Sequence, residues 1–275
     1  MKIALCNEVL APMPFARQCE FAASVGYDGL EVAPFTLSDE PHLLIPQERV
    51  AIRRAADGAG VAITGLHWLL LAPKGLSITS TDDAVRARTV EVMRRLVGLC
   101  AELGGSVLVH GSPGQRQVPP GESRAAALAR AQDCFAAAGE EAARAGVVYC
   151  IEPLATTETP LVNTVAEAAA IVDAIGSPGL RTMVDTCAAA QSEAEPVAAV
   201  LERWLPTGRI AHVQVNDRNR RGPGEGEDRF APVFAALKHA GYGGVVAVEP
   251  FKYVPDGATC AARSIGYVRG ILEGL

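Results

Sequence analysis

The sequence predicts an α/β fold in which eight strand–helix units close into a single (β/α)8 barrel of the TIM type. Short β-branched runs alternate eight times with Ala-, Arg- and Glu-rich stretches of helical period. The expected strands begin 26 to 44 residues apart, which leaves room for one strand, one helix and two connections in each unit. No Ser/Gly linker, charge block or break in composition divides the chain, so we expect one domain over residues 1–275.

The expected strands are apolar throughout, which is typical of parallel strands that are buried on both faces. An open doubly wound sheet is the second candidate fold, but no GxGxxG motif follows the first strand. The expected strands are residues 3–9, 29–34, 62–69, 106–110, 147–152, 180–185, 210–216 and 245–249.

The expected helices consist of strong helix formers and carry clear end signals. Asp82 and Ser123 stand where N-caps would stand, and several of the helices are followed by glycine, the residue suited to the left-handed position after a helix. These glycines are Gly26, Gly60, Gly104, Gly146 and Gly241. The expected helices are residues 15–25, 46–59, 82–103, 123–145, 165–175, 195–205, 228–240 and 261–272.

The composition excludes several classes of protein. A hydrophobic fraction of 49% with 20% charged residues excludes a disordered or coiled-coil chain. A formal charge of −6 without any Lys/Arg cluster argues against a protein built to bind nucleic acid. The longest apolar stretch, residues 61–73, is too short and too interrupted to span a membrane. The seven cysteines are scattered and include no CxxC pair, so we expect reduced thiols and a cytoplasmic protein.

Polar residues gather at the carboxyl ends of the expected strands, which in a barrel of this type face the active-site mouth. Glu152, Asp185, Gln214 and Glu249 end four consecutive strands, at spacings of 33, 29 and 35 residues. The other polar or aromatic residues at strand ends are Asn7, Glu8, Glu31, His67, Trp68 and His110.

Three carboxylates and an amide at one mouth indicate a cation site. Clustered carboxylates raise one another's pKa, and a bound divalent cation removes that cost. Donors that are all oxygen favour a hard ion, Mn²⁺ or Mg²⁺, over zinc. The alternative is that Glu152 and Glu249 pair with arginines such as Arg181 or Arg220, without any metal.

Five short motifs together give the chain a family resemblance. It resembles the xylose isomerase-like TIM barrel superfamily of sugar isomerases and epimerases, which includes ketose 3-epimerases and hydroxypyruvate isomerase. The resemblance covers essentially the whole chain and is clearest over residues 148–251. The motifs are Cys150-Ile151-Glu152-Pro153-Leu154, Val184-Asp185-Thr186, Ala211-His212-Val213-Gln214-Val215, the loop 219–226, and Val248-Glu249-Pro250.

The resemblance implies one divalent metal ion held by Glu152, Asp185, Gln214 and Glu249. Mn²⁺ is the first choice for this ion, and Mg²⁺, Co²⁺ and Zn²⁺ are alternatives. Most ketose epimerases have His at the position of Gln214, whereas the hydroxypyruvate isomerases have Gln. In the family the two glutamates are also the catalytic acid/base pair. From the resemblance we also expect a homodimer or a homotetramer.

The resemblance also points to substrate-binding residues. Arg220 matches an arginine that contacts the bound sugar, and Glu158 matches a substrate-contacting glutamate. The chain departs from the family three residues after the metal-binding Asp, where relatives usually have His and this sequence has Ala188. Either His67 or His110 supplies the missing donor, with Trp68 as an aromatic wall, or the substrate differs from that of familiar members. Two other interpretations of both histidines are open: they are hydrogen-bonded residues near the mouth, or they are ligands for a second metal ion.

We therefore expect a metal-dependent isomerase or epimerase that acts on a small keto-sugar or hydroxy-keto acid. A metal-stabilised enediolate would form, with Glu152 and Glu249 removing and returning a proton on opposite faces. A lyase or dehydratase acting on a keto-sugar or keto-inositol is the alternative, because proton abstraction beside a carbonyl starts both reactions. An endonuclease acting at abasic sites is disfavoured by the charge and by the missing histidines. The expected partner is a small carbohydrate-like substrate, with no nucleic acid and no membrane.

Overall fold

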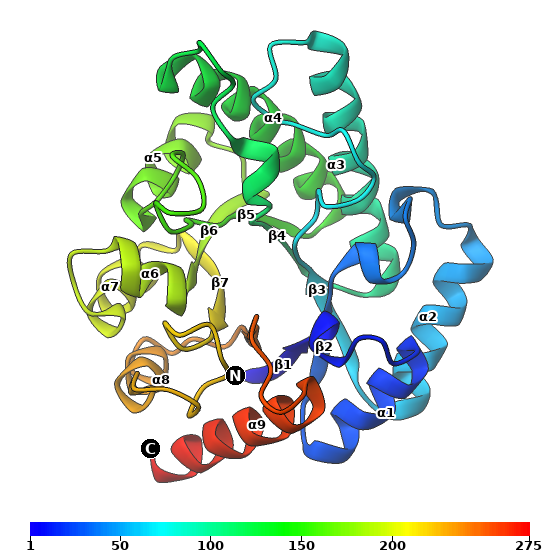
Figure 1. Ribbon diagram of the computed structural model, residues 1–275, viewed down its shortest axis with the longest axis vertical. Coiled ribbons are helices and arrows are strands. Elements are labelled where there is room, and N and C mark those ends of the chain that lie inside the picture. The colour runs from blue at the N-terminus through cyan, green and yellow to red at the C-terminus, as the bar shows by residue number, and fades with distance from the viewer.

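The computed structural model describes residues 1–275, and its eight parallel strands form one closed barrel in chain order. Figure 1 shows the helices arranged around the outside of the strands. The last strand pairs with the first, Ile3 opposite Val246, so the sheet has no free edge and the doubly wound alternative is wrong. The strands are β1 (Lys2–Cys6), β2 (Gly29–Val32), β3 (Ala62–Leu66), β4 (Val107–His110), β5 (Val148–Ile151), β6 (Leu180–Asp185), β7 (Ile210–Val215) and β8 (Val245–Val248).

The outer helices begin and end close to the predicted signals. Asp82 and Ser123 accept hydrogen bonds from the backbone N–H groups of Ala84 and Ala126, as N-caps do. The five glycines expected after helices all have positive φ. The helices are α1 (Phe15–Val25), α2 (Pro46–Ala59), α3 (Asp83–Leu103), α4 (Arg124–Ala145), α5 (Val165–Ile175), α6 (Thr186–Ser192), α7 (Val197–Trp204), α8 (Ala231–His239) and α9 (Gly257–Gly274).

Several strands are shorter at their carboxyl ends than the sequence predicts. The expected strand 3–9 stops at Cys6, because Asn7–Leu10 forms the 3-10 helix η1. The expected strand 62–69 stops at Leu66, and Trp68 has a φ of 50°, which a strand cannot accommodate. The other predicted strands are each one or two residues longer than the observed strands. The exception is β6, which has its predicted bounds. The polar residues after these strands therefore stand on short turns above the barrel.

The prediction missed α6, which begins directly after β6. The Asp185 side chain caps this helix by accepting a hydrogen bond from the Ala188 N–H at 2.7 Å. The expected helix 195–205 begins later, at Val197, after Pro196. The expected helix 228–240 begins at Ala231, since Asp228 instead accepts hydrogen bonds from Arg218. The expected helix 261–272 is longer, because Asp256 caps it before Gly257.

The main apolar core is a cluster of 62 buried residues contributed by strands and helices. A smaller cluster of Val107, Val109, Cys150 and Met183 belongs to β4, β5 and β6. All seven cysteines are buried and free, which agrees with the absence of a disulfide pattern. No helix has the length and the apolar character that crossing a bilayer requires.

The parallel register brings the predicted site residues to one end of the barrel. Asp185 lies opposite Gln214 in the β6–β7 pair, and Cys6 lies opposite Glu31 in the β1–β2 pair. Glu152 and Glu249 each follow the last residue of a strand, β5 and β8. Since all strands run in the same direction, these side chains share the carboxyl-terminal mouth.

Candidate active site

Three carboxylates from three strands converge at the mouth. Each of Glu152, Asp185 and Glu249 offers an oxygen, and these oxygens all lie within 4.8 Å of one another. The three residues are only 7%, 4% and 5% exposed. We call this group the carboxylate cluster. Three predicted ligands from strands far apart in the sequence thus meet at one point.

Burial makes negative charge costly in the carboxylate cluster. It raises the pKa of Asp185 from 3.8 to about 7, because the charged form is taken out of water. The pKa values of Glu152 and Glu249 are also raised well above the ordinary range, first by burial and then by neighbouring carboxylates. A bound divalent cation would offset both causes, because its charge stabilises the deprotonated carboxylates.

Gln214 adds a fourth oxygen donor. Its amide N–H donates to Glu31 Oε1 at 2.7 Å, which leaves the amide oxygen without a hydrogen-bond partner. Asp185 Oδ2 and Glu249 Oε2 are likewise buried without a partner. Buried oxygens without donors are costly unless a cation pairs with them. Oxygen donors of this kind fit a hard divalent ion such as Mn²⁺ or Mg²⁺.

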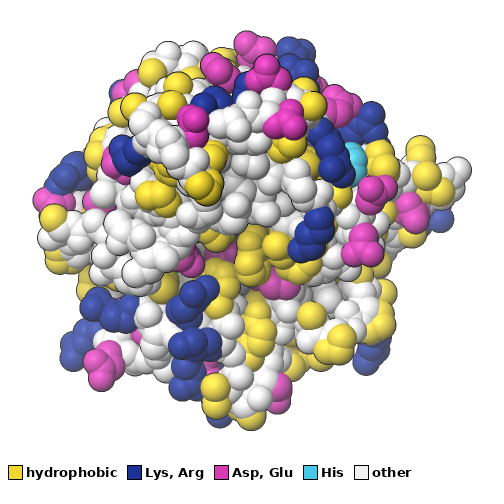
Figure 2. Space-filling view, turned by 45° about the horizontal axis from the view of Figure 1, so that its top comes forward, with side chains coloured by type: hydrophobic (Ala, Val, Ile, Leu, Met, Phe, Trp, Pro, Cys, Tyr) yellow, Lys and Arg dark blue, Asp and Glu magenta, His cyan; other side chains and the backbone are white.

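The carboxylate cluster borders a cavity of about 160 Å³. Its polar lining includes Glu158 and Arg220, and its apolar lining includes Trp68 and Phe251. The Trp68 ring meets the Phe251 ring edge to face at 5.9 Å, and the Arg220 guanidinium lies 4.7 Å from the centre of the Phe251 ring. Figure 2 shows acidic side chains in a hollow near the middle of one face, with hydrophobic and basic side chains beside it.

Arg220 faces Glu158 rather than the carboxylate cluster. Its guanidinium Nη2 lies 3.6 Å from Glu158 Oε1, and both residues line the cavity. The Arg220 carbonyl accepts hydrogen bonds from the backbone N–H groups of Phe251 and Lys252, which ties its loop to β8. Arg181 donates instead to backbone carbonyls, including that of Leu180. Neither Arg181 nor Arg220 forms an ion pair with Glu152 or Glu249, so the two arginines that the metal-free alternative named do not neutralise these acids.

The two predicted histidines are fully buried, and neither lines the cavity. His67 Nε2 lies 2.9 Å from Glu8 Oε2 and 3.7 Å from Glu249 Oε1. His110 Nδ1 lies 2.7 Å from the Tyr149 hydroxyl, and burial together with the charge of Arg116 lowers the pKa of His110 to about 3. His67 therefore contacts the carboxylate cluster, whereas His110 is neutral and contacts Tyr149. Direct contact of either with a substrate stays a prediction.

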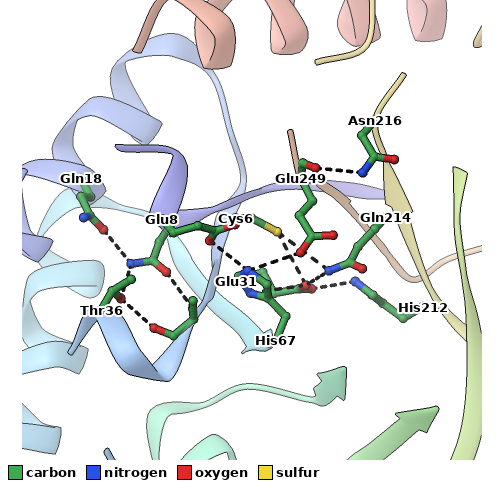
Figure 3. Close-up of polar contacts among 12 residues, drawn as sticks. Cys6, Glu8, Gln18, Glu31, Thr36, His67, His212, Gln214, Asn216 and Glu249 are labelled. Carbon is green, nitrogen blue, oxygen red and sulfur yellow. Dashed lines mark hydrogen bonds and ion pairs between the residues drawn. The ribbon is translucent and has the colours of Figure 1, made fainter. Parts of the chain in front are cut away.

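Sequence reasoning assigned no role to Glu31, although it stands at the end of β2. Its carboxylate accepts the Gln214 hydrogen bond and lies 2.7 Å from His212 Nε2 (Figure 3). Burial alone would raise the pKa of Glu31, but His212, His67 and Gln214 together outweigh burial and keep this pKa below its usual value. Glu31 therefore orients the amide of Gln214. A signal was present, because an acid in an apolar strand requires a partner.

Arg116 was missed altogether. It belongs to the 3-10 helix Pro113–Arg116, is almost fully buried, and its guanidinium nitrogens make no hydrogen bonds. Burial lowers its pKa to about 10, while the charges of Glu152 and Glu158 oppose that shift. Nothing in the sequence distinguished this arginine, because it lies in a loop without regular spacing.

The absence of a side chain at Gly111 leaves room for the Glu152 carboxylate. A Cβ at position 111 would collide with Glu152 Oε2. We expect Gly111→Ala to displace this flexible carboxylate and to lower kcat about 10²-fold, with little change in melting temperature. Steady-state kinetics and thermal unfolding test this. Gly114→Ala is the matched control, because a Cβ there meets no atom within 4 Å. Unchanged kcat for Gly111→Ala would contradict the placement of Glu152.

Comparison with protein families identifies relatives of the whole barrel. A family model described as xylose isomerase-like TIM barrel matches residues 19–270. The L-ribulose 3-epimerase of Mesorhizobium japonicum is 32% identical over 205 residues, a match that spans 72% of this chain but only 65% of that relative. The D-psicose 3-epimerase of Agrobacterium fabrum is 27% identical over 242 residues, which covers 86% of this chain and 79% of that enzyme.

Solved structures share the fold. A crystal structure of D-psicose 3-epimerase in the presence of D-fructose has a TM-score of 0.84 and 22% identity, and the match covers 99% of both chains. The 3-keto-D-glucoside 4-epimerase of E. coli has a TM-score of 0.83 and 21% identity, over 98% of this chain and 99% of that one. At these identities the likeness concerns the barrel and its helices.

Proposed function

Because the chain belongs to the xylose isomerase-like TIM barrel family, we propose that it is a metal-dependent epimerase or isomerase of a small keto-sugar. The observation that carries this proposal is the carboxylate cluster, in which three buried acids border one cavity. Two of the relatives named above are ketose 3-epimerases, which supports epimerisation at a carbon next to a carbonyl. It also favours an epimerase over the lyase or dehydratase.

The metal ion would be held by Glu152, Asp185, Gln214 and Glu249. Support comes from the unpartnered oxygens of the last three and from the raised pKa values of the three acids. When bound, a divalent ion supplies Lewis-acid stabilisation of the negative charge that develops on the substrate oxygens. Mn²⁺ is our first choice.

Glu152 and Glu249 are the proposed acid/base pair. They follow β5 and β8, which lie on different sides of the barrel, so they can approach a bound substrate from two directions. One carboxylate would remove the proton beside the carbonyl, and the other would return a proton from the opposite face. Return to the same carbon gives an epimer, whereas return to the neighbouring carbon gives an isomer.

Arg220, Glu158 and Trp68 are the proposed substrate-binding residues. Arg220 and Glu158 face each other at the cavity and can bond to hydroxyl or carbonyl oxygens. Trp68 and Phe251 offer an apolar wall for the carbon skeleton. Ala188 also lines the cavity and has no hydrogen-bonding side chain, so substrate oxygens near it must find donors elsewhere.

Exchange of a carbon-bound hydrogen tests this function. The Mn²⁺-loaded protein is incubated in D₂O with D-psicose, D-fructose, L-ribulose and L-ribulose 5-phosphate, and products are followed by NMR. We expect deuterium at C3 and the C3 epimer of at least one ketose, with both lost after chelation. A dehydrated product would instead establish the lyase. No exchange with any ketose at saturating Mn²⁺ would contradict the proposal.

Asp185→Asn provides the matched control for metal dependence. This variant keeps the size of the side chain but removes one charge from the carboxylate cluster. We expect weaker Mn²⁺ binding and recovery of exchange at higher Mn²⁺ concentration. Asp173→Asn, an exposed acid paired with Arg209, should behave as wild type.

A further inference from the structure

A second group of metal-binding side chains lies against the carboxylate cluster, on the side of β1 and β3. Cys6, Glu8, His67 and Glu249 each offer one donor atom, and these four atoms all lie within 4.8 Å of one another. Their exposed fractions are 0%, 8%, 0% and 5%. We call these four residues the inner cluster. Cys6 and Glu8 have no part in the proposed reaction.

Among the ligand atoms of the inner cluster, those of Glu8 and His67 have no hydrogen-bond partner, whereas the Cys6 thiol faces Glu31 Oε1 at 3.8 Å. Both carboxylate oxygens of Glu8 and both ring nitrogens of His67 are buried without a hydrogen-bond partner. His67 Nε2 lies 2.9 Å from Glu8 Oε2, but the two atoms are not aligned as donor and acceptor. Figure 3 shows Glu8 and Glu249 directed toward His67 from two sides. The contact is an ion pair when His67 is protonated, and a cation bound by Glu8 and His67 would take its place.

We propose that the inner cluster binds a second divalent cation, zinc. Its donors are an imidazole nitrogen, a thiol sulfur and two carboxylates, which is the mixture that zinc selects in four-coordinate sites. The carboxylate cluster and Gln214 offer only oxygen and favour a harder ion. The same mouth therefore holds two sites of different chemical preference.

Glu249 belongs to both groups and can serve both ions. Its Oε1 lies 3.7 Å from His67 Nε2, whereas its Oε2 is buried and has no hydrogen-bond partner. A carboxylate with two separate oxygens can bridge two cations, as in two-metal sites. Zinc in the inner cluster would then hold Glu249 in position from the side opposite the cavity.

The backbone holds the inner cluster in place before any ion binds. Cys6 ends β1, Glu8 stands in η1, and His67 follows β3. The neighbouring Asn7 fixes η1, since its side chain bonds to Gln18, Thr36 and the Ala33 N–H. The His67 backbone N–H donates to the carbonyl of Val32, which fixes the turn after β3.

The Glu31 carboxylate lies next to two ligands of the inner cluster. Glu31 Oε1 lies 3.8 Å from His67 Nδ1, the ring nitrogen on the far side from Glu8, and 3.8 Å from Cys6 Sγ. A carboxylate beside the second nitrogen of a metal-binding histidine is common in metal sites, although at 3.8 Å Glu31 makes no hydrogen bond to this nitrogen. Zinc binding would release the Cys6 thiol proton to solvent, because the thiolate is the ligand.

Cobalt spectroscopy tests the site without any measurement of activity. The full-length protein is stripped of metal and titrated with Co²⁺, which absorbs in the near ultraviolet when a thiolate is bound to it. We expect this absorption in the wild type and its loss in Cys6→Ser. Cys19→Ser, a buried thiol on α1, is the matched control and should keep the band. No thiolate band in the wild type at saturating Co²⁺ would overturn the proposal.

Zinc content measured by elemental analysis provides the second readout. We expect about two ions per zinc-saturated wild-type chain and about one in His67→Ala or Glu8→Gln, each checked for folding by circular dichroism. If folded His67→Ala kept both the thiolate band and the zinc content of the wild type, the inner cluster would not be a metal site. The double variant Glu152→Gln/Asp185→Asn should lose the other ion and keep the thiolate band. The inner site can therefore be established even if the proposed function fails.

Discussion

Replacing either Glu152 or Glu249 by glutamine is expected to lower kcat about 10²–10⁴-fold, which is the usual contribution of a positioned acid or base. Glutamine keeps the size and one oxygen donor of each side chain but cannot carry a proton. Both carboxylates are buried beside the cavity, where they can reach a bound substrate. Steady-state kinetics at saturating Mn²⁺ measures the loss.

Hydrogen exchange separates a catalytic role from mere metal binding. If the two glutamates act on opposite faces, each variant should lose C3 exchange with one epimer and keep it with the other. The two variants should then show reciprocal patterns. Loss of exchange with the same epimer in both would contradict the assignment, and so would wild-type turnover in either. Glu202→Gln, an exposed acid on α7, is the control and should match the wild type.

For the chain without bound metal, we expect the free energy of unfolding to fall as pH rises. The pKa of Asp185 is about 7 in the folded chain against 3.8 ordinarily, so between these values the folded state binds more protons than the unfolded state. The free energy of unfolding therefore falls as pH rises through this range, and a shift of this size corresponds to about 4 kcal/mol. Glu152 and Glu249 act in the same direction.

Urea unfolding at about pH 5 and about pH 8, with chelator and with Mn²⁺, measures this effect. The chelated protein should be less stable at the higher pH. Added Mn²⁺ should stabilise more at the higher pH, because the ion binds the deprotonated carboxylates. Glu152→Gln/Asp185→Asn should reduce the pH dependence of the chelated protein. If the chelated wild type were more stable at about pH 8 than at about pH 5, the raised pKa values of the buried carboxylates would be contradicted.

Local patterns in the sequence predicted most elements of the fold. The periodic helix 15–25 and the β-branched strand 180–185 are observed with the predicted bounds. Errors lie where strands give way to turns, as at Asn7 and Trp68, and at α6, a short helix capped by Asp185. At Asn7 the tertiary hydrogen bonds of one side chain outweigh the apolar pattern, and at α6 a local cap does so.

Candidate ligands could be identified from the sequence because each stands at the end of a strand. The sequence could not show that His110 is turned away against Tyr149, or that Arg116 is buried near Glu152. It could not show that Arg220 faces Glu158 either. These are relations between segments far apart in the chain, which spacing does not encode.

The sequence by itself determined the barrel, its order of elements and the set of acids at its mouth. The reason is that strand and helix periodicity and the positions of strand ends are local properties of the chain. Only the tertiary structure decided which donors share a point in space. Barrel closure sets β1 between β2 and β8, so Cys6 and Glu8 meet Glu249 across a separation of more than two hundred residues. Closure of this kind depends on packing and strand register, which no local pattern contains.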